Sequence, residues 1–387
     1  MVYAIAIARA IPTFGVMEMT VPKPEKEKEM MTAIGLMSGT SMDGIDAALL
    51  QTDGEKVTGI GAAVSISYDE DFKNQLRGLL GRDPDGEAHA RAIAEDLTRR
   101  HAEAVREVLK ESGLAAKDIG VIGFHGHTVL HRPGDGITRQ IGDGALLADE
   151  TGIPVVCDFR ANDVANGGEG APLAPLYHAA LSLNYEKPLA VLNIGGVANV
   201  TWISPDGGLI AFDTGPGNAL IDDWARRHDG GVMDLDGRLA HEGTVDGAVL
   251  ARLGDHPYFE RPYPKSLDRD EFDAAPVAGL SAADGAATLT AFTAACVEKA
   301  VHLFPALPNR WLVCGGGRLN PAIMAALRGQ LSEPVEPVEM AGWHGDALEA
   351  QAFAFLAVRS LNGLPLSLPS TTGVKAPATG GVLHRPG

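Results

Sequence analysis

The sequence has few cysteines, and they lie far apart. Its three cysteines, Cys157, Cys296 and Cys314, form no CxxC pair, and each has apolar neighbours. An odd number at such wide spacing predicts neither a disulfide framework nor a zinc site. We expect three buried free thiols in a reducing compartment, which favours a cytoplasmic protein.

The chain also lacks a membrane segment and an excess of basic residues. No run approaches the roughly 20 apolar residues that are needed to cross a bilayer. Acidic residues number 50 and basic residues 32, which gives a formal net charge of −18. A body this acidic repels phosphate backbones, so nucleic-acid binding is not expected, although local backbone amides can still bind a small anion.

What the chain does have is length and an ordinary globular composition. Its 387 residues exceed one typical core, and 45% of them are apolar and 21% charged. We expect two domains, over residues 31–183 and 184–365, with 366–387 as a C-terminal segment that returns to the first domain. Residues 1–30 are predicted to be a disordered extension, because the run PKPEKEKE at Pro22–Glu29 offers no periodic face to bury.

Strand and helix patterns alternate along the chain, and one plan occurs twice. Each half opens with short apolar strands around a glycine-rich turn, namely Ala33–Met37 and Ile45–Gln51 in the first half and Leu189–Ile194 and Val200–Ser204 in the second. Helices and strands then alternate, up to a long helix over Gly345–Leu361. This order predicts two related α/β domains with a ligand cleft between them.

The turn between the first two strands, GTSMDGID, is the first block that predicts chemistry. Its glycines and hydroxyls suit the close approach of a phosphate, although a plain hairpin explains the block at least as well. Asp43 could hold Mg²⁺ through water, and Asp213 is the second candidate metal ligand. The nucleotide-binding candidates in this block are Gly39, Thr40, Ser41, Met42, Asp43, Gly44, Ile45 and Asp46.

Three further glycine clusters follow strands in the second half. They read NIGGVANVT, DTGPGN and CGGGRLN, and the last two lead into helix N-termini, which favour anions. Open α/β sheets bind ligands at such strand ends, so the clusters predict a nucleotide site, although each alone is also consistent with a structural turn. The candidate residues are Gly195, Gly196, Asn199, Gly215, Gly217, Asn218, Gly315 and Gly316.

Two polar blocks of the first half predict the substrate side of the cleft. FHGHT follows the expected strand Ile119–Phe124, and because its two histidines lack a third zinc ligand, a substrate-facing loop is favoured. The block DFRANDVANGGEGAPL is a glycine-rich loop in which Asp163 could take a proton from a hydroxyl or water, unless it is a surface loop with capping acids. The substrate candidates are His125, Gly126, His127, Arg160, Gly170, Ala171 and Pro172.

Together these blocks resemble the anhydro-N-acetylmuramic acid kinase family of the hexokinase–actin-like sugar kinases. The matching runs, in the family's order, are IGLMSGTSMDGIDAALL, GFHGHTVLHRP, QIGDG, DFRANDVANGGEGAPLAP, LNIGGVANVT, FDTGPGN, CGGGRLNP and GDALEAQAFAFLA. The resemblance implies two actin-like (ribonuclease H-like) α/β domains that flank a cleft for ATP and substrate. It also implies that a homodimer is possible.

The resemblance implies a reaction as well as a fold. Members use ATP and Mg²⁺ to open the 1,6-anhydro ring of anhydro-N-acetylmuramic acid with water and to phosphorylate O6, giving N-acetylmuramic acid 6-phosphate and ADP in cell-wall recycling. Gly39–Asp46 match the family's ATP-phosphate segment, and Asp163 matches its catalytic aspartate, which would deprotonate the water. Glu349, in GDALEAQ, is predicted to be a second catalytic carboxylate near the sugar. The alternative is that it is only an acidic residue in the first turn of a helix, where it stabilises the helix N-terminus.

The chain departs from the family at position 127, where members usually have glutamine in HGQT. A histidine can carry charge, so we expect a protonated His127 to attract the lactyl carboxylate of the muramic sugar. Three other functions remain open: a levoglucosan-type kinase, a non-catalytic actin-like ATP-binding switch, and a structural protein. A base at the cleft argues against the switch, and the glycine turns argue against a structural protein.

Overall fold

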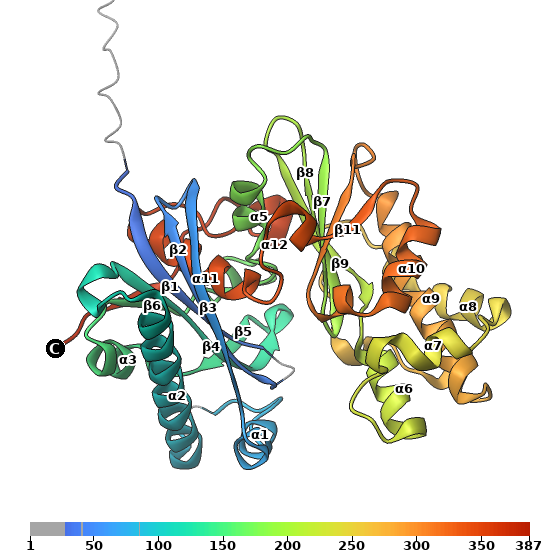
Figure 1. Cartoon of the computed structure of the whole chain (residues 1–387), viewed down its shortest axis with the longest axis horizontal. Helices are drawn as coiled ribbons and strands as arrows, with labels where there is room; N and C mark the ends of the chain where they lie inside the picture. The colour runs from blue at the N-terminus through green and yellow to red at the C-terminus, as the bar shows by residue number, and fades with distance from the viewer. Residues whose placement is uncertain (1–27, 40–41, 85) are drawn as a thin grey trace, which may run out of the picture.

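The computed structural model of the chain describes residues 28–39, 42–84 and 86–387 (Figure 1). The predicted extension therefore lies largely outside the described residues, as do the candidates Thr40 and Ser41. Two α/β domains, each built on one sheet, lie side by side, which confirms the predicted fold class. Among the described residues, none of the helices combines the length and the hydropathy that crossing a bilayer demands.

The first sheet has the strand order β12-β6-β4-β1-β2-β3, with β5 paired to β4. Strands β1, β2 and β3 are antiparallel neighbours, whereas β4 and β6 run parallel to β1. The strands are β1 (Met31–Ser38), β2 (Gly44–Thr52), β3 (Val57–Ser67), β4 (Val121–Arg132), β5 (Ile137–Ile141), β6 (Val155–Cys157) and β12 (Val382–His384). The helices that follow these strands are α1 (Glu70–Arg77), α2 (Ala88–Ser112), α3 (Gly144–Thr151), α4 (Ala161–Ala165) and α5 (Pro175–Leu181).

The second sheet repeats this plan with the strand order β11-β10-β7-β8-β9. Three antiparallel strands are again followed by two parallel ones, so the order matches β6-β4-β1-β2-β3 of the first sheet. The strands are β7 (Leu189–Ile194), β8 (Val197–Ile203), β9 (Leu209–Pro216), β10 (Trp311–Cys314) and β11 (Val335–Pro337). The helices beside them are α6 (Ala219–Asp229), α7 (Arg238–Glu242), α8 (Gly247–Gly254), α9 (Ala282–Val301) and α10 (Pro321–Gln330).

Helix α11 (Leu348–Leu361) crosses between the domains. It falls within the range 184–365 that was predicted as the second domain, but it packs on β1, β2 and β4 of the first sheet. Glycines allow this close approach: a Cβ at Gly35 would lie 1.7 Å from the carbonyl oxygen of Ala350. Conversely, α5 precedes residue 184 but contacts β8 and β9. By their packing, α11 therefore belongs with the first sheet and α5 contacts the second, whereas the domain boundary predicted at residue 184 assigns each to the other domain.

The chain's last residues run from the second sheet to the first. Helix α12 (Pro369–Thr372) contacts β9 and lies between the two sheets in Figure 1. Further on, the Asn162 side chain donates to the carbonyl oxygen of Thr379 at 2.7 Å, and β12 pairs antiparallel with β6. Residues 366–387 thus touch both domains and end on the first.

Strand β4 is longer than predicted, and this changes the role of its histidines. The expected strand ended at Phe124, but β4 runs to Arg132, because β5 pairs with its second half, for example His127 with Ile141. His125 and His127 consequently lie inside a buried strand. The prediction that they form a substrate-facing loop is wrong.

Candidate active site

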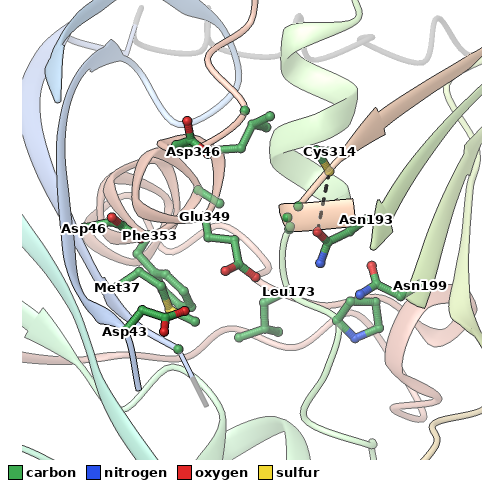
Figure 2. Close-up of a pocket in the computed structure, with 18 of the residues that line it drawn as sticks. Met37, Asp43, Asp46, Leu173, Asn193, Asn199, Cys314, Asp346, Glu349 and Phe353 are labelled. Atoms are coloured by element: carbon green, nitrogen blue, oxygen red, sulfur yellow. Dashed lines mark hydrogen bonds between the residues drawn. The ribbon is translucent and has the colours of Figure 1, made fainter. Parts of the chain in front are cut away.

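A cleft of about 480 Å³ is lined by residues of both domains (Figure 2). The first domain contributes the β1–β2 turn, the end of β3 and the loop after α4, and the second contributes residues of β7 to β10. The start of α11 completes the wall. The predicted residues that line the cleft are Gly39, Asp43, Gly44, Asp46, Arg160, Ala171, Pro172, Asn199, Asp213, Gly315, Gly316 and Glu349.

One side of the cleft carries carboxylates. Figure 2 shows Glu349 of α11 and Asp43 of the β1–β2 turn on this side, with Asp46 behind them. Desolvation within the cleft raises the pKa of Glu349, and the charge of Asp46 adds to this, whereas Arg160 opposes it. Desolvation likewise raises the pKa of Asp46, against a hydrogen bond of 2.5 Å from the Ser65 hydroxyl. Such crowded carboxylates favour a proton, a cation or a hydroxyl donor between them.

The opposite side carries amides and glycine turns. Asn193 and Asn199 are paired across β7 and β8, and both side chains lie on this side in Figure 2. Gly315 after β10 has φ of 73°, and a Cβ there would lie 2.4 Å from Oδ1 of Asn193, so only glycine fits. A Cβ at Gly316 would be accommodated, because its nearest atom, Nδ2 of Asn218, would lie 3.6 Å away. This side suits an anionic ligand, because it presents bare backbone and neutral amides.

Arg318 orders the glycine turn after β10, a role that sequence reasoning did not predict. Its buried guanidinium donates to Glu339 and Asp346 at 2.8 Å each and to the carbonyl oxygen of Gly315 at 3.1 Å. Two carboxylates balance its charge, so Arg318 orders the turn rather than offering a free cation to phosphate. The only local signal was its place directly after the glycine run. Other lining residues that sequence reasoning did not select include Asn193, His178, Cys314 and Asp346.

Asp163 is buried in α4 rather than exposed in the cleft. Its side chain is 2% exposed and does not line the cleft, although its neighbours Arg160 and Ala171 do. Its Oδ1 accepts a hydrogen bond of 2.7 Å from the backbone N–H of Gly170. The candidate base is therefore held immediately behind the cleft wall.

The charge of Arg160 interacts with those of both Asp163 and Glu349, and a hydrogen bond to His125 holds its side chain. Burial lowers the pKa of Arg160 to about 10, while the charges of Glu349 and Asp163 oppose this, so the guanidinium stays charged. Its Nε donates to Nε2 of His125 at 3.1 Å, and Nη1 donates to the carbonyl oxygen of Gly170 at 2.8 Å. His125 Nδ1 is 2.8 Å from the carbonyl oxygen of Gly126, which requires the proton on Nδ1. His125, Gly126 and Gly170 thus hold Arg160 and do not line the cleft.

His127 does not lie on the cleft either. It is completely buried, with Nδ1 2.9 Å from the Ser38 hydroxyl, which in turn is 2.7 Å from the Tyr68 hydroxyl. Burial lowers the pKa of His127 to about 4, so the ring is neutral near neutral pH. The expectation that a charged His127 attracts a substrate carboxylate is contradicted, because β4 carries the residue into the first domain's core.

The remaining nucleotide candidates do not line the cleft. Met42 and Ile45 lie in the first domain's apolar core. A Cβ at Gly215 would contact Cys296, and the N–H of Asn218 donates to the carbonyl oxygen of Gly195 at 2.7 Å. The residues of this kind that do not line the cleft are Met42, Ile45, Gly195, Gly196, Gly215, Gly217 and Asn218.

The two predicted metal ligands fit Mg²⁺. Asp213 at the end of β9 and Asp43 both line the cleft. Burial raises the pKa of Asp213 to about 7, against a hydrogen bond from the Leu267 N–H of 2.8 Å, so its charge lacks a full counter-charge. Mg²⁺ is commonly held by one or two carboxylates together with substrate phosphates and water, which this pair can supply. Across the described part of the chain, no group of three or more His, Cys, Asp or Glu side chains has metal-binding geometry.

The chain is similar to proteins of known structure and of known family. Among solved structures, a xylulose kinase from Lactobacillus acidophilus aligns over 92% of this chain and 94% of its own, with a TM-score of 0.44 and 12% identity. The anhydro-N-acetylmuramic acid kinase of Paramagnetospirillum magneticum is 58% identical over 359 residues, covering 92% of this chain and 100% of that protein. The corresponding protein of Rhodospirillum rubrum is 58% identical over 351 residues, covering 90% and 93%. Since the sequence pattern of that family also matches residues 31–386, the chain belongs to the anhydro-N-acetylmuramic acid kinase family.

Proposed function

We propose that the protein uses ATP and Mg²⁺ to open the 1,6-anhydro ring of anhydro-N-acetylmuramic acid and to phosphorylate O6. The observation that carries this proposal is the family match over residues 31–386, in a chain whose cleft sets carboxylates opposite glycine turns. The free thiols suit a reducing compartment, so the reaction is assigned to the cytoplasm. The products are N-acetylmuramic acid 6-phosphate and ADP.

In the proposed reaction, Asp163 accepts a proton from a water molecule. The water oxygen bonds to C1 of the sugar as the C1–O6 bond breaks, and O6 bonds to the γ-phosphorus while ADP leaves. Phosphoryl transfer needs positioning and charge neutralisation more than covalent help. The glycine turns of the second domain position the phosphates, and Arg160 supplies a buried cation beside the carboxylates.

Two further groups have assigned tasks. Glu349, whose pKa is raised mainly by desolvation, would accept a hydrogen bond from a sugar hydroxyl on the acidic side of the cleft, which it lines. Mg²⁺, when bound, would be held by Asp43 and Asp213 and would neutralise phosphate charge.

Product analysis tests this proposal. The protein is incubated with ATP, Mg²⁺ and the anhydro sugar in ¹⁸O-water, and products are followed by mass spectrometry from the earliest times. We expect one ADP for each sugar phosphate, one water-derived oxygen in the sugar, and little ADP without sugar. Levoglucosan runs in parallel. Faster turnover of levoglucosan, or equal ADP formation without any sugar, would contradict the assigned substrate.

A further inference from the structure

The candidate base is clamped by two hydroxyls from the far end of the chain. Oδ2 of Asp163 accepts hydrogen bonds from the Ser367 hydroxyl at 2.5 Å and from the Thr372 hydroxyl at 2.6 Å. All three side chains are at least 97% buried, since Ser367 is 2%, Thr372 0% and Asp163 2% exposed. Neither hydroxyl belongs to any of the glycine or acidic blocks that predicted the site.

Counting lone pairs shows what the clamp leaves open. A carboxylate offers about two acceptor positions on each oxygen. The two hydroxyls fill both positions of Oδ2, whereas within the described residues Oδ1 accepts only the N–H of Gly170 at 2.7 Å. All three partners donate to the carboxylate, so together they fix its orientation and leave one acceptor position on Oδ1.

We propose that Ser367 and Thr372 are positioning residues that orient the Asp163 carboxylate and leave its Oδ1 as the oxygen that takes the proton from water. The proposal rests on the assigned role of Asp163 as the base in ring opening. It deepens that role, because it identifies the reacting atom and the groups that orient it.

The clamp also joins the base to the second domain. The N–H of Glu169, in the loop after Asp163, donates to the carbonyl oxygen of Thr372 at 2.6 Å, so Thr372 binds this loop at two points. Its helix α12 contacts β9, and the Glu169 carboxylate accepts a hydrogen bond of 2.8 Å from the Ser266 hydroxyl of the second domain. The orientation of the Asp163 carboxylate therefore depends on chain segments from both domains.

The test uses Thr372→Val, Ser367→Ala and the double variant of the full chain. We expect kcat to fall about tenfold in each single variant and on the order of 10²-fold in the double variant, because the base loses its orientation. KM for ATP should stay unchanged, since neither hydroxyl lines the cleft. Thr372→Ser, which keeps the hydroxyl, should restore kcat.

Thr371→Val is the matched control. The Thr371 hydroxyl is also buried in α12, but it accepts the Leu368 N–H at 3.1 Å and does not touch Asp163. This variant should lower Tm without lowering kcat. If Thr372→Val fails to fold, Ser367→Ala carries the same test. Unchanged kcat in Ser367→Ala and Thr372→Val, in a protein that turns over the sugar, would overturn the clamp and leave the proposed function intact.

A second readout needs no substrate. Carbon NMR of the Asp163 carboxyl, identified by its loss in Asp163→Asn, reports the hydrogen bonds that this carboxyl accepts. Its resonance should shift in Ser367→Ala and keep its position in Thr371→Val. An unchanged resonance in Ser367→Ala would refute the clamp, whereas a shifted resonance in a protein without sugar turnover would support the clamp and reject only the proposed substrate.

Discussion

In both sheets the first two strands form a hairpin that contributes to the cleft, β1–β2 in the first domain and β7–β8 in the second. The register is comparable, since Met37 pairs with Asp46 in one and Asn193 with Asn199 in the other. The first hairpin thus carries carboxylates, and the second carries amides around a Gly195-Gly196 turn. Helix α11 adds Glu349 to the acidic side.

This difference shows how one repeated fold can divide a reaction between its copies. The acidic side can manage protons, a cation and sugar hydroxyls, whereas the amide and glycine side can accept phosphates without repelling them. A net charge of −18 is compatible with ATP binding because the second domain presents neutral amides and bare backbone around Gly315 and Gly316, where the phosphates would lie.

Replacing the base should give the largest effect on this division. Asp163→Asn keeps the size of the side chain but removes the proton acceptor, so kcat should fall by about 10²–10⁴-fold while the Kd for ATP stays the same. The matched control is Asp158→Asn, because Asp158 is exposed and its φ of 56° is tolerated by asparagine. Steady-state kinetics and ATP calorimetry give both values. A variant that retains more than about a tenth of wild-type kcat would remove Asp163 from the role of base.

A pair of glycine variants should separate nucleotide binding from folding in the second domain. A Cβ at Gly316, which lines the cleft, would find its nearest atom at 3.6 Å, in Asn218, whereas one at Gly217 would lie 2.2 Å from the carbonyl oxygen of Gly195. Gly316→Ala should therefore keep its Tm but raise the Kd for ATP about tenfold, because the methyl group obstructs the phosphates. Gly217→Ala should lower Tm. Equal ATP affinity in Gly316→Ala and wild type would show that phosphate does not approach this turn.

The smallest expected effect concerns the pH dependence of stability at Asp213. Burial raises its pKa from 3.8 to about 7 in the folded protein, so the folded state keeps a proton that the unfolded chain has released. This group therefore stabilises the fold fully below about pH 4, and its contribution is lost as pH rises to about 7. Asp213→Asn removes the titrating group. The Tm of the variant minus the Tm of wild type should therefore increase as pH rises from about 4 to about 7. Parallel Tm curves in calorimetry would show that Asp213 does not titrate in this way.

Local patterns were sufficient for the strands of both hairpins and for the long helices. The predicted helix over Gly345–Leu361 is α11, Leu348–Leu361. The predicted strand Leu189–Ile194 is β7, with five of its six residues buried. Such elements follow from periodicity and end signals that lie within the element itself.

What the sequence could not show depends on partners that are distant in the chain. β4 extends past Phe124 only because β5 pairs with it, and that pairing buries His127. Ser367 lies 204 residues and Thr372 209 residues from Asp163, so no local pattern connects them. Burial patterns tell which residues are inside, but they do not tell which neighbour a buried polar group finds.

The central claim is that the nucleotide binds to the second domain with its phosphates facing the β1–β2 turn, and that the sugar binds to the first domain and α11. Hydrogen–deuterium exchange measured with ADP alone, and then with ADP and the anhydro sugar, tests it most directly. ADP alone should slow exchange over residues 193–199 and 315–319 and leave 160–173 unchanged. The sugar should then slow exchange over 160–173. Protection of 160–173 by ADP alone, without protection of 315–319, would contradict the account.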